Sequence, residues 1–192
     1  MIRGILSLWA WFAMGLVALL WLPWLALVYV LTAPSDPGRY AVGRWFRRAA
    51  MTAVAMNPLW HFRTSGYRPP DPRRPYVAVS NHESVADIFL LSHLPWEMKW
   101  LSKDSIFRIP VMGWMMRMAG DISVRRTERS SRVEALEQCR DRLERRVSVM
   151  IFPEGTRSKT GELLPFKDGA FRVAIEAGAP ILPIAVAGTR RP

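Results

Sequence analysis

The chain has 192 residues, which is enough for one domain with its own hydrophobic core. Its formal net charge of +11 favours an anionic partner, such as an anionic lipid, a phosphorylated substrate or nucleic acid. A single cysteine and three histidines argue against an intrachain disulfide and against a Cys- or His-rich metal site, so we expect no metal. The glycine-rich loops of the common nucleotide-binding folds do not occur in the sequence either.

The N-terminal segment is apolar and carries no charged residue from Gly4 to Ser35. As one straight helix it would be roughly 45 Å long, against about 30 Å for the hydrocarbon core of a bilayer. It could tilt, kink at Pro23, or form two shorter helices within one leaflet. A signal peptide is the alternative, but the apolar run is too long for one and has no clear small-residue cleavage site. We therefore predict a membrane anchor.

Basic residues flank this apolar run unequally. One arginine precedes it, whereas four follow it closely. The positive-inside tendency therefore places the rest of the chain on the cytoplasmic side, and we expect a location at the cell inner membrane. We predict a hydrophobic anchor with its basic flank over residues 1–64, including a surface helix over 44–61, and an α/β catalytic domain over 65–192. The arginines are Arg3 before the run and Arg39, Arg44, Arg47 and Arg48 after it.

Beyond residue 75, short apolar strands alternate with amphipathic helices, which is the pattern of an α/β domain. We predict a central mixed sheet flanked by helices. The stretch 105–119 holds four methionines and is either ordinary core or an adaptable wall for an acyl chain. The predicted strands cover residues 76–79, 98–102, 122–124, 147–152 and 181–186. The first predicted helix of this domain begins at Ser84. The others cover residues 105–119, with a break at Pro110, 128–146 and 166–177.

His82 and Asp87 follow the first predicted strand of this domain. Ser84 and Asp87 have the spacing of a capping box, which predicts that the helix begins at Ser84. Inside one regular helix, residues five apart would lie about 140° apart around the axis. With His82 in the turn before the helix the two side chains can meet, and the carboxylate would then orient the imidazole as a general base. The alternative is structural: Asp87 caps the helix and His82 is an ordinary turn residue.

Candidate anion ligands follow two other predicted strands. Glu154, Gly155 and Arg157 come after the strand at 147–152, and Arg126 comes after another. Gly155 permits a tight turn, Glu154 can orient a guanidinium or a ligand hydroxyl, and Arg157 offers a planar pair of donors. Ligands of open α/β sheets gather beyond the carboxyl ends of the strands, so a phosphate clamped near the imidazole is predicted. The alternative is ordinary surface arginines in polar loops.

Four motifs occur along this domain, between about Tyr76 and Thr189. They are Asn81–Asp87 (NHESVAD), Gly120–Arg126 (GDISVRR), Phe152–Ser158 (FPEGTRS) continuing into Leu164–Gly169 (LPFKDG), and Ile181–Val186 (ILPIAV). In these motifs and in their order, the sequence resembles the glycerolipid acyltransferases, specifically the 1-acyl-sn-glycerol-3-phosphate acyltransferases. Any one motif is a weak signal, whereas four in family order behind an apolar N-terminus form a specific one.

The resemblance implies acyl transfer by a His-x4-Asp pair. By resemblance, His82 removes the proton of the acceptor hydroxyl and Asp87 orients it, with acyl-CoA or acyl-carrier protein as co-substrate and no cofactor. The resemblance also implies that lysophosphatidic acid is the acceptor, phosphatidic acid the product and the lipid bilayer a partner. The motif around Pro183 is linked to catalysis or to the acyl donor. The residues that the resemblance and the anion-site pattern assign to substrate binding are Arg126, Glu154, Gly155, Thr156, Arg157 and Lys167.

Two features depart from the family pattern. Arg125 stands where members more often carry a polar or acidic residue, which concerns the acceptor headgroup. The sequence also ends soon after the fourth motif, whereas members usually continue with more sheet and helix. Both a short member and a C-terminally truncated domain therefore stay open.

Three other functions remain as alternatives. An acyltransferase for another lysolipid, such as a lyso-amino-acid lipid, would keep His82 and Asp87. A non-catalytic protein that binds anionic lipid through its basic surface would tolerate the loss of His82. A nucleic-acid binder is disfavoured because the arginines of 128–146 are interleaved with acidic residues and no recognition motif occurs.

Overall fold

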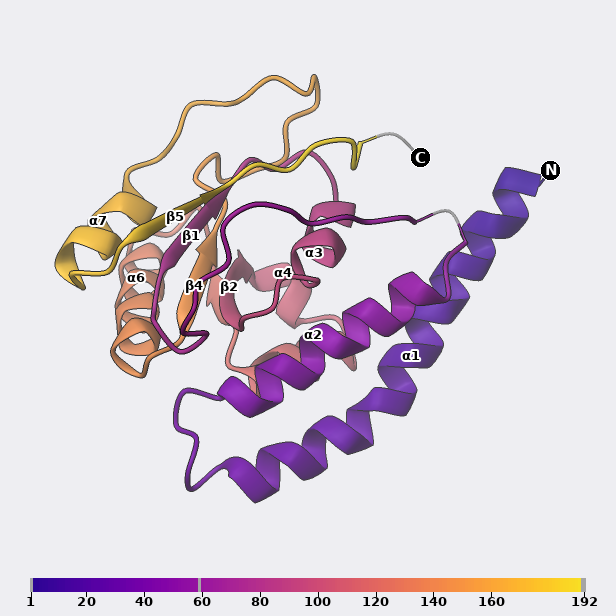
Figure 1. The fold of residues 1–192 in the computed structure, drawn as a ribbon, viewed down its shortest axis with the longest axis horizontal. Coiled ribbons are helices and arrows are strands. Elements are labelled where there is room, and N and C mark those ends of the chain that lie inside the picture. Colours follow the sequence, from indigo (N-terminus) through magenta and orange to yellow (C-terminus); the bar gives the residue numbers. More distant parts are fainter. Residues whose placement is uncertain (1, 59, 191–192) are drawn as a thin grey trace.

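The computed structural model describes residues 2–58 and 60–190 (Figure 1), in which a parallel five-stranded sheet has the order β3-β2-β4-β1-β5. The α/β fold predicted from the sequence is confirmed, although all four pairings between the described strands are parallel and the sheet is not mixed. The strands are β1 Val77–Ser80, β2 Met98–Lys103, β3 Ile122–Val124, β4 Ser148–Ile151 and β5 Ile181–Ile184. The helices are α1 Ile2–Thr32, α2 Tyr40–Ala55, α3 Ala86–Leu91, α4 Asp104–Phe107, α5 Met112–Ala119, α6 Arg129–Glu144 and α7 Gly169–Glu176.

Both faces of the sheet are covered, as a parallel sheet requires. Alternate residues of a strand point to opposite faces, so Val77 and Val79 pack with α6 and α7. Ala78, between them, belongs instead to a cluster with Trp96 and Trp100 on the other face. Figure 1 shows α6 and α7 on one side of the sheet and α2 and α3 on the other. The carboxyl ends of all five strands lie along one edge, which is where ligands bind in such sheets.

The predicted ends of the helix over 44–61 are wrong. α2 begins at Tyr40 because Asp36 accepts the N–H of Ala41 through Oδ2 at 2.7 Å, which satisfies a donor of the first turn. The helix ends at Ala55, two residues before Asn57. Asn57 precedes a proline, and the residue before proline is disfavoured in helical geometry.

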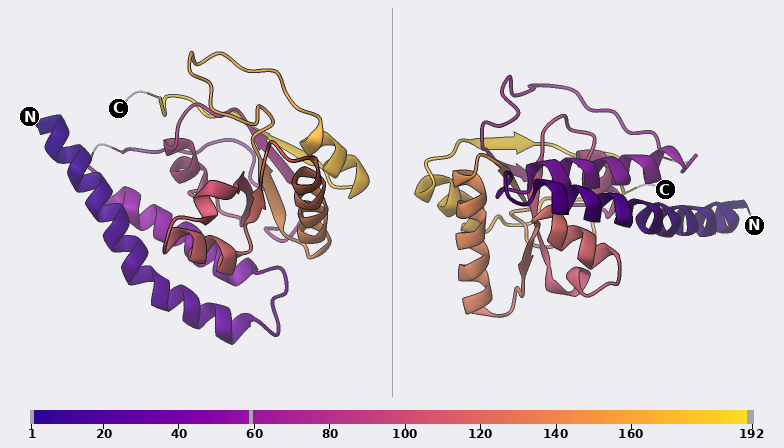
Figure 2. Two further views of the ribbon diagram at one scale, coloured as in Figure 1. Left: turned by 180° about the vertical axis from the view of Figure 1, so that it is seen from behind. Right: turned by 90° about the horizontal axis from the view of Figure 1, so that it is seen from below.

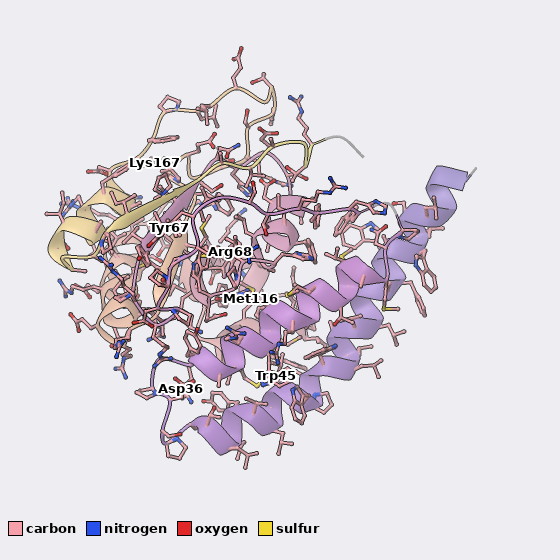
Figure 3. The ribbon with its side chains drawn as sticks, viewed as in Figure 1. Asp36, Trp45, Tyr67, Arg68, Met116 and Lys167 are labelled. Carbon is pink, nitrogen blue, oxygen red and sulfur yellow. The ribbon has the colours of Figure 1, made fainter. Side chains whose placement is uncertain are left out.

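α1 is one continuous helix that contains Pro23 and changes direction along its length (Figure 1). Within it, Leu6–Thr32 is long and apolar enough to cross a membrane. Figure 2 shows its N-terminal part extending beyond the rest of the molecule. Large apolar side chains remain exposed along it, including Trp11 (70%) and Leu31 (69%). Trp45 of α2 packs against this helix (Figure 3), with its ring centroid 5.2 Å from that of Trp24.

A cluster of buried charged side chains holds α2 against the sheet. Lys99 is fully buried, and its Nζ donates to Glu97 Oε1 at 2.9 Å and to two backbone carbonyls. Arg47, one of the arginines of the predicted basic flank, points into the protein and donates to Asp121 Oδ1 at 2.5 Å. Gly43 lies so close that a Cβ there would be 1.9 Å from Glu97 Oε1. α2 is therefore joined to the α/β part through ionic contacts as well as apolar packing.

Candidate active site

The turn between β1 and α3 brings the side chains of His82 and Asp87 together. Asp87 Oδ2 lies 2.8 Å from His82 Nδ1, and the carboxylate is fully buried. The predicted helix start is off by two residues, because α3 begins at Ala86. The residues before it form a turn in which Glu83 and Ser84 donate their N–H groups to the same Oδ2, at 2.8 and 2.9 Å. Asp87 thus accepts hydrogen bonds from the backbone of the turn and also contacts the imidazole. It therefore both stabilises the turn and orients the His82 ring.

Hydrogen bonds keep Asp87 ionised. Burial alone would raise the pKa of this carboxyl, but the hydrogen bonds donated by His82, Ser84, Thr189 and Glu83 together lower it below its ordinary value. An ionised carboxylate can only accept a hydrogen bond, so Nδ1 of His82 carries the proton. In the neutral ring Nε2 is then the nitrogen without a proton, and it can accept one from a bound hydroxyl.

Phe152 holds the imidazole from one face. It follows β4, the neighbour of β1, and its ring lies parallel to that of His82 with 3.9 Å between centroids and 14° between planes. Stacking of this kind limits rotation of the ring. We did not select Phe152 as a site residue from the sequence, although it opens the third motif. Its position beside His82 follows from the pairing of β1 with β4.

Glu154 binds the protein's own backbone. Its side chain is buried, with Oε1 accepting the N–H of His82 at 2.8 Å and Oε2 accepting the N–H of Leu164 at 3.0 Å. The sequence predicts that this carboxylate orients a guanidinium or a substrate hydroxyl. In the structure both oxygens instead tie the turn that carries His82 to the loop that follows β4.

Glu154→Gln is expected to destabilise this connection. The amide offers one acceptor oxygen where the carboxylate offers two, so one partly buried backbone N–H loses its partner, at a cost of about 1–3 kcal/mol. For a chain of this size each kcal/mol lowers the melting temperature by about 2–4 °C. Thermal unfolding of the purified protein in detergent measures the change. Glu162→Gln, at an exposed loop position, is the control. Equal melting temperatures for the two variants would contradict the role of Glu154.

The remaining predicted substrate ligands are solvent-exposed, apart from the half-buried Gly155, and not all of them are close to the dyad formed by His82 and Asp87. Lys167 lies against Gly155, where a Cβ would be 2.7 Å from its Nζ, and the φ of 70° at Gly155 also favours glycine. Arg157 is exposed in the same loop. Arg126 follows β3, which is three strands away from β1, or about 14 Å at the usual strand spacing. The structure therefore groups Lys167 and Arg157 with the loop after β4, whereas Arg126 follows the strand at the far edge of the sheet. Thr156 is also exposed in that loop.

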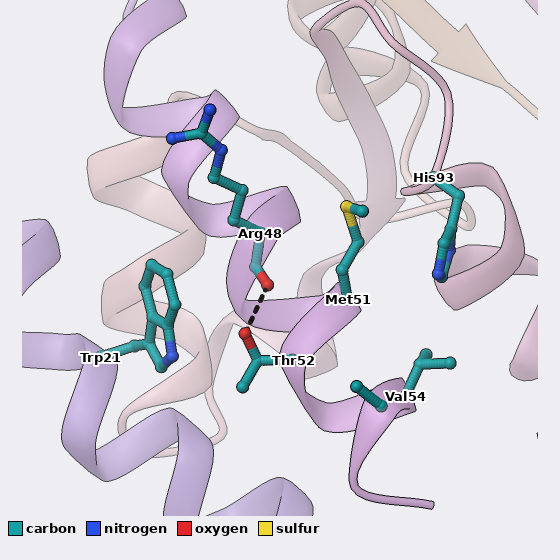
Figure 4. Close-up of a pocket in the computed structure, with 7 residues that line it drawn as sticks. Trp21, Arg48, Met51, Thr52, Val54 and His93 are labelled. Atoms are coloured by element: carbon teal, nitrogen blue, oxygen red, sulfur yellow. Dashed lines mark hydrogen bonds between the residues drawn. The ribbon is translucent and has the colours of Figure 1, made fainter.

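A different histidine lines a groove of about 480 Å³ between α1 and α2 (Figure 4). His93 faces Met51 and Val54 of α2 across this groove, and Trp21 of α1 lies on its far side. The Nδ1 atom of His93 lies 2.8 Å from the backbone oxygen of Phe89. His93, in the turn after α3, is thus paired with the backbone of that helix, whereas the imidazole with a buried carboxylate is that of His82.

The sequence matches the family model described as Acyltransferase over residues 61–187, which is well over half of the chain. A 1-acyl-sn-glycerol-3-phosphate acyltransferase of Chlamydomonas reinhardtii is 45% identical over 120 residues, covering 62% of this chain and 36% of that protein. The enzyme of that name from Escherichia coli is 31% identical over 167 residues, covering 84% and 65%. The chain thus spans less than half the length of its algal relative.

The fold is also that of a solved structure, the 1-acyl-sn-glycerophosphate acyltransferase PlsC from Thermotoga maritima. The TM-score is 0.78 at 24% sequence identity, covering 98% of this chain and 76% of that one. At this identity the likeness shows a common fold. The family model and the named relatives confirm the resemblance seen in the four motifs. This chain belongs to the acyltransferase family.

Proposed function

We propose that this protein is a membrane-bound acyltransferase that esterifies the sn-2 hydroxyl of 1-acyl-glycerol-3-phosphate and forms phosphatidic acid. The observation that carries the proposal is the buried Asp87 carboxylate 2.8 Å from His82 Nδ1, at the carboxyl edge of the sheet. The names of the relatives support the choice of lysophosphatidic acid as acceptor. Acyl-CoA or acyl-carrier protein is the proposed donor.

The chemistry follows from the free nitrogen of the imidazole. Nε2 of His82 takes the proton of the acceptor hydroxyl as its oxygen attacks the thioester carbonyl carbon. The thiolate leaves and receives that proton, so the ester and the free thiol form without an acyl-enzyme intermediate. Asp87 stays ionised and stabilises the transient imidazolium, while Phe152 and Glu154 keep the ring and its backbone in place. General-base catalysis of this kind contributes about 10²–10⁴ in rate.

We place the acceptor phosphate at the loop after β4. Arg157 and Lys167 supply positive charge there, and the guanidinium of Arg157 can bind two phosphate oxygens. Arg126 is the third proposed ligand and would reach the phosphate from β3.

Arg157→Ala is expected to raise KM for lysophosphatidic acid about 10- to 100-fold with a much smaller change in kcat. A hydrogen bond to a charged group contributes about 1.5–3 kcal/mol, and this one would form before the chemical step as well as during it. Steady-state kinetics with lysophosphatidic acid and with an uncharged monoacylglycerol measure the effect, which should be confined to the phosphorylated acceptor. The control is Arg172→Ala, since Arg172 lies on α7 and pairs with Glu176 at 3.6 Å. An unchanged KM in Arg157→Ala would place the phosphate elsewhere.

The anchor supports a location at the inner membrane with the α/β part on the cytoplasmic side. Leu6–Thr32 is a candidate membrane span whose window is only 17% buried in the protein. Acceptor and product are both lipids, so an active site held at the interface avoids extracting them into water. The arginines after α1 favour the cytoplasmic side, although Arg47 is buried and contributes to the fold instead.

Membranes containing the protein test the proposed reaction directly. They are incubated with lysophosphatidic acid, neutral lysolipids or amino lysolipids, each with acyl-CoA and with acyl-carrier protein as donor. Phosphatidic acid formation supports the proposal and ranks the donors. Transfer only to acceptors without a phosphate would keep the mechanism and reject the acceptor. Lipid binding without any transfer from folded protein would indicate a non-catalytic lipid-binding protein.

A further inference from the structure

The segment after β5 folds back over the turn that carries His82. The amide side chain of Asn81 makes two hydrogen bonds with the backbone of Val186, donating to its oxygen and accepting its N–H, both at 2.8 Å. β5 is the parallel neighbour of β1, which brings these two residues from 105 positions apart into contact. The chain beyond Val186 therefore starts at a fixed place beside the turn.

This segment then turns toward the buried carboxylate. Gly188 has a φ of 81°, a conformation that side-chain-bearing residues rarely adopt. The next residue, Thr189, donates its hydroxyl to Oδ1 of Asp87. Oδ2, the other oxygen, serves His82 and the N–H groups of Glu83 and Ser84. The two oxygens of Asp87 thus have separate partners, one set from its own turn and one from the segment after β5.

We propose that Thr189 is a positioning residue for acyl transfer, whose hydroxyl holds the Asp87 carboxylate with Oδ2 directed at His82 Nδ1. A carboxylate bound through one oxygen can rotate about its Cβ–Cγ bond. A donor on the second oxygen sets the plane of the group, and with it the orientation of the imidazole. The kinetic part of this inference rests on the proposed acyl transfer. Thr189 lies beyond the fourth motif, and it reaches the dyad because β5 lies beside β1.

Thr189→Val tests the hydroxyl because valine keeps the shape of threonine and removes the donor. We expect kcat for lysophosphatidic acid to fall about 10- to 100-fold, the range of a hydrogen bond to a charged group, with KM changed less than about twofold. Thr189→Ser retains the hydroxyl and is expected to keep kcat within about threefold of the wild type. The control is Thr160→Val, in an exposed loop, which should behave as wild type. Unchanged kcat in Thr189→Val, a loss confined to KM, or a serine variant as impaired as the valine variant would overturn the proposal.

A second measurement does not depend on turnover. The protein has three histidines, so the ring signals of ¹⁵N-histidine-labelled protein in detergent can be assigned with His82→Ala. We expect the Nδ1–H proton of His82 to resonate far downfield in the wild type and in Thr189→Ser, and to move upfield or broaden in Thr189→Val. The signals of His61 and His93 should stay in place, which checks that the variant is folded. If the wild type transfers no acyl group, the proposed function fails while this signal still decides the role of Thr189. An Nδ1–H signal unchanged by Thr189→Val would overturn it.

Discussion

His82→Ala is expected to lower kcat for acyl transfer by about 10²–10⁴, the usual contribution of a general base. The imidazole is the group whose free nitrogen can take the acceptor proton, and alanine leaves the buried Asp87 without it. KM for lysophosphatidic acid should change little, because the proposed phosphate ligands lie on the loop after β4. Product formation from radiolabelled donor, measured in membranes with matched protein content, gives both constants.

Asp87→Asn separates the orientation of the imidazole from its presence. The asparagine side chain is nearly the same size but can present its NH₂ group to Nδ1, which would favour the tautomer protonated at Nε2 and remove the base. We expect a loss similar to that of His82→Ala and little further loss in the double variant, because the two residues act as one unit. His61→Ala, at an exposed position, is the control. Transfer at the wild-type rate in His82→Ala would reject the dyad mechanism.

Lys99→Met is expected to destabilise the protein by about 3–5 kcal/mol, the cost of leaving one member of a buried ion pair without its partner. Glu97 and Lys99 are completely buried, and burial raises the pKa of the glutamate and lowers that of the lysine, so each depends on the other to remain charged. Domains are typically stable by only about 5–15 kcal/mol, so this is a large share of the total. Denaturant unfolding in detergent, followed by tryptophan fluorescence, measures the loss.

Two further variants test the cause of this loss. Glu97→Gln combined with Lys99→Met removes both charges and is expected to recover part of the stability, because no unpaired ion remains buried. Arg140→Met breaks an exposed contact with Glu144 at 3.9 Å and should cost less than about 1 kcal/mol. The contacts of Lys99 with the backbone of Arg39 and Ala119 also link α2 to α5. A loss in Lys99→Met no larger than in Arg140→Met would show that the buried pair does not hold these elements together.

Much of this fold could be predicted from local patterns. Each of the five predicted strands agrees with the structure to within two residues, and the break at Pro110 separates α4 from α5 as expected. The contact between His82 and Asp87 also follows from local geometry, since His82 lies in the turn before α3 and Asp87 lies five residues later in the first turn of that helix. The N-terminal helix of membrane-spanning length can also be predicted from local sequence, because its length and its lack of charged residues are visible without any tertiary contact.

Contacts between distant segments could not be predicted in this way. In the sequence, Glu154 fits a substrate ligand and Arg47 a basic flank, yet both side chains are buried against protein partners. The phosphate site predicted near the imidazole includes Arg126, and the strand that Arg126 follows, β3, lies three strands from β1. Neither Phe152 nor Thr189 was selected, because each reaches the dyad through a strand pairing.

The sequence by itself therefore determined the element types and the membrane-length helix, and it showed that His82 and Asp87 can meet. Hydrophobic periodicity, charge and short spacing act within a few turns of the chain, so they can be read without coordinates. Only the tertiary structure decided which face a charged side chain takes and what supports the dyad. The order of parallel strands is set by packing of the whole sheet, and that order brings Phe152, Glu154 and Thr189 to one turn.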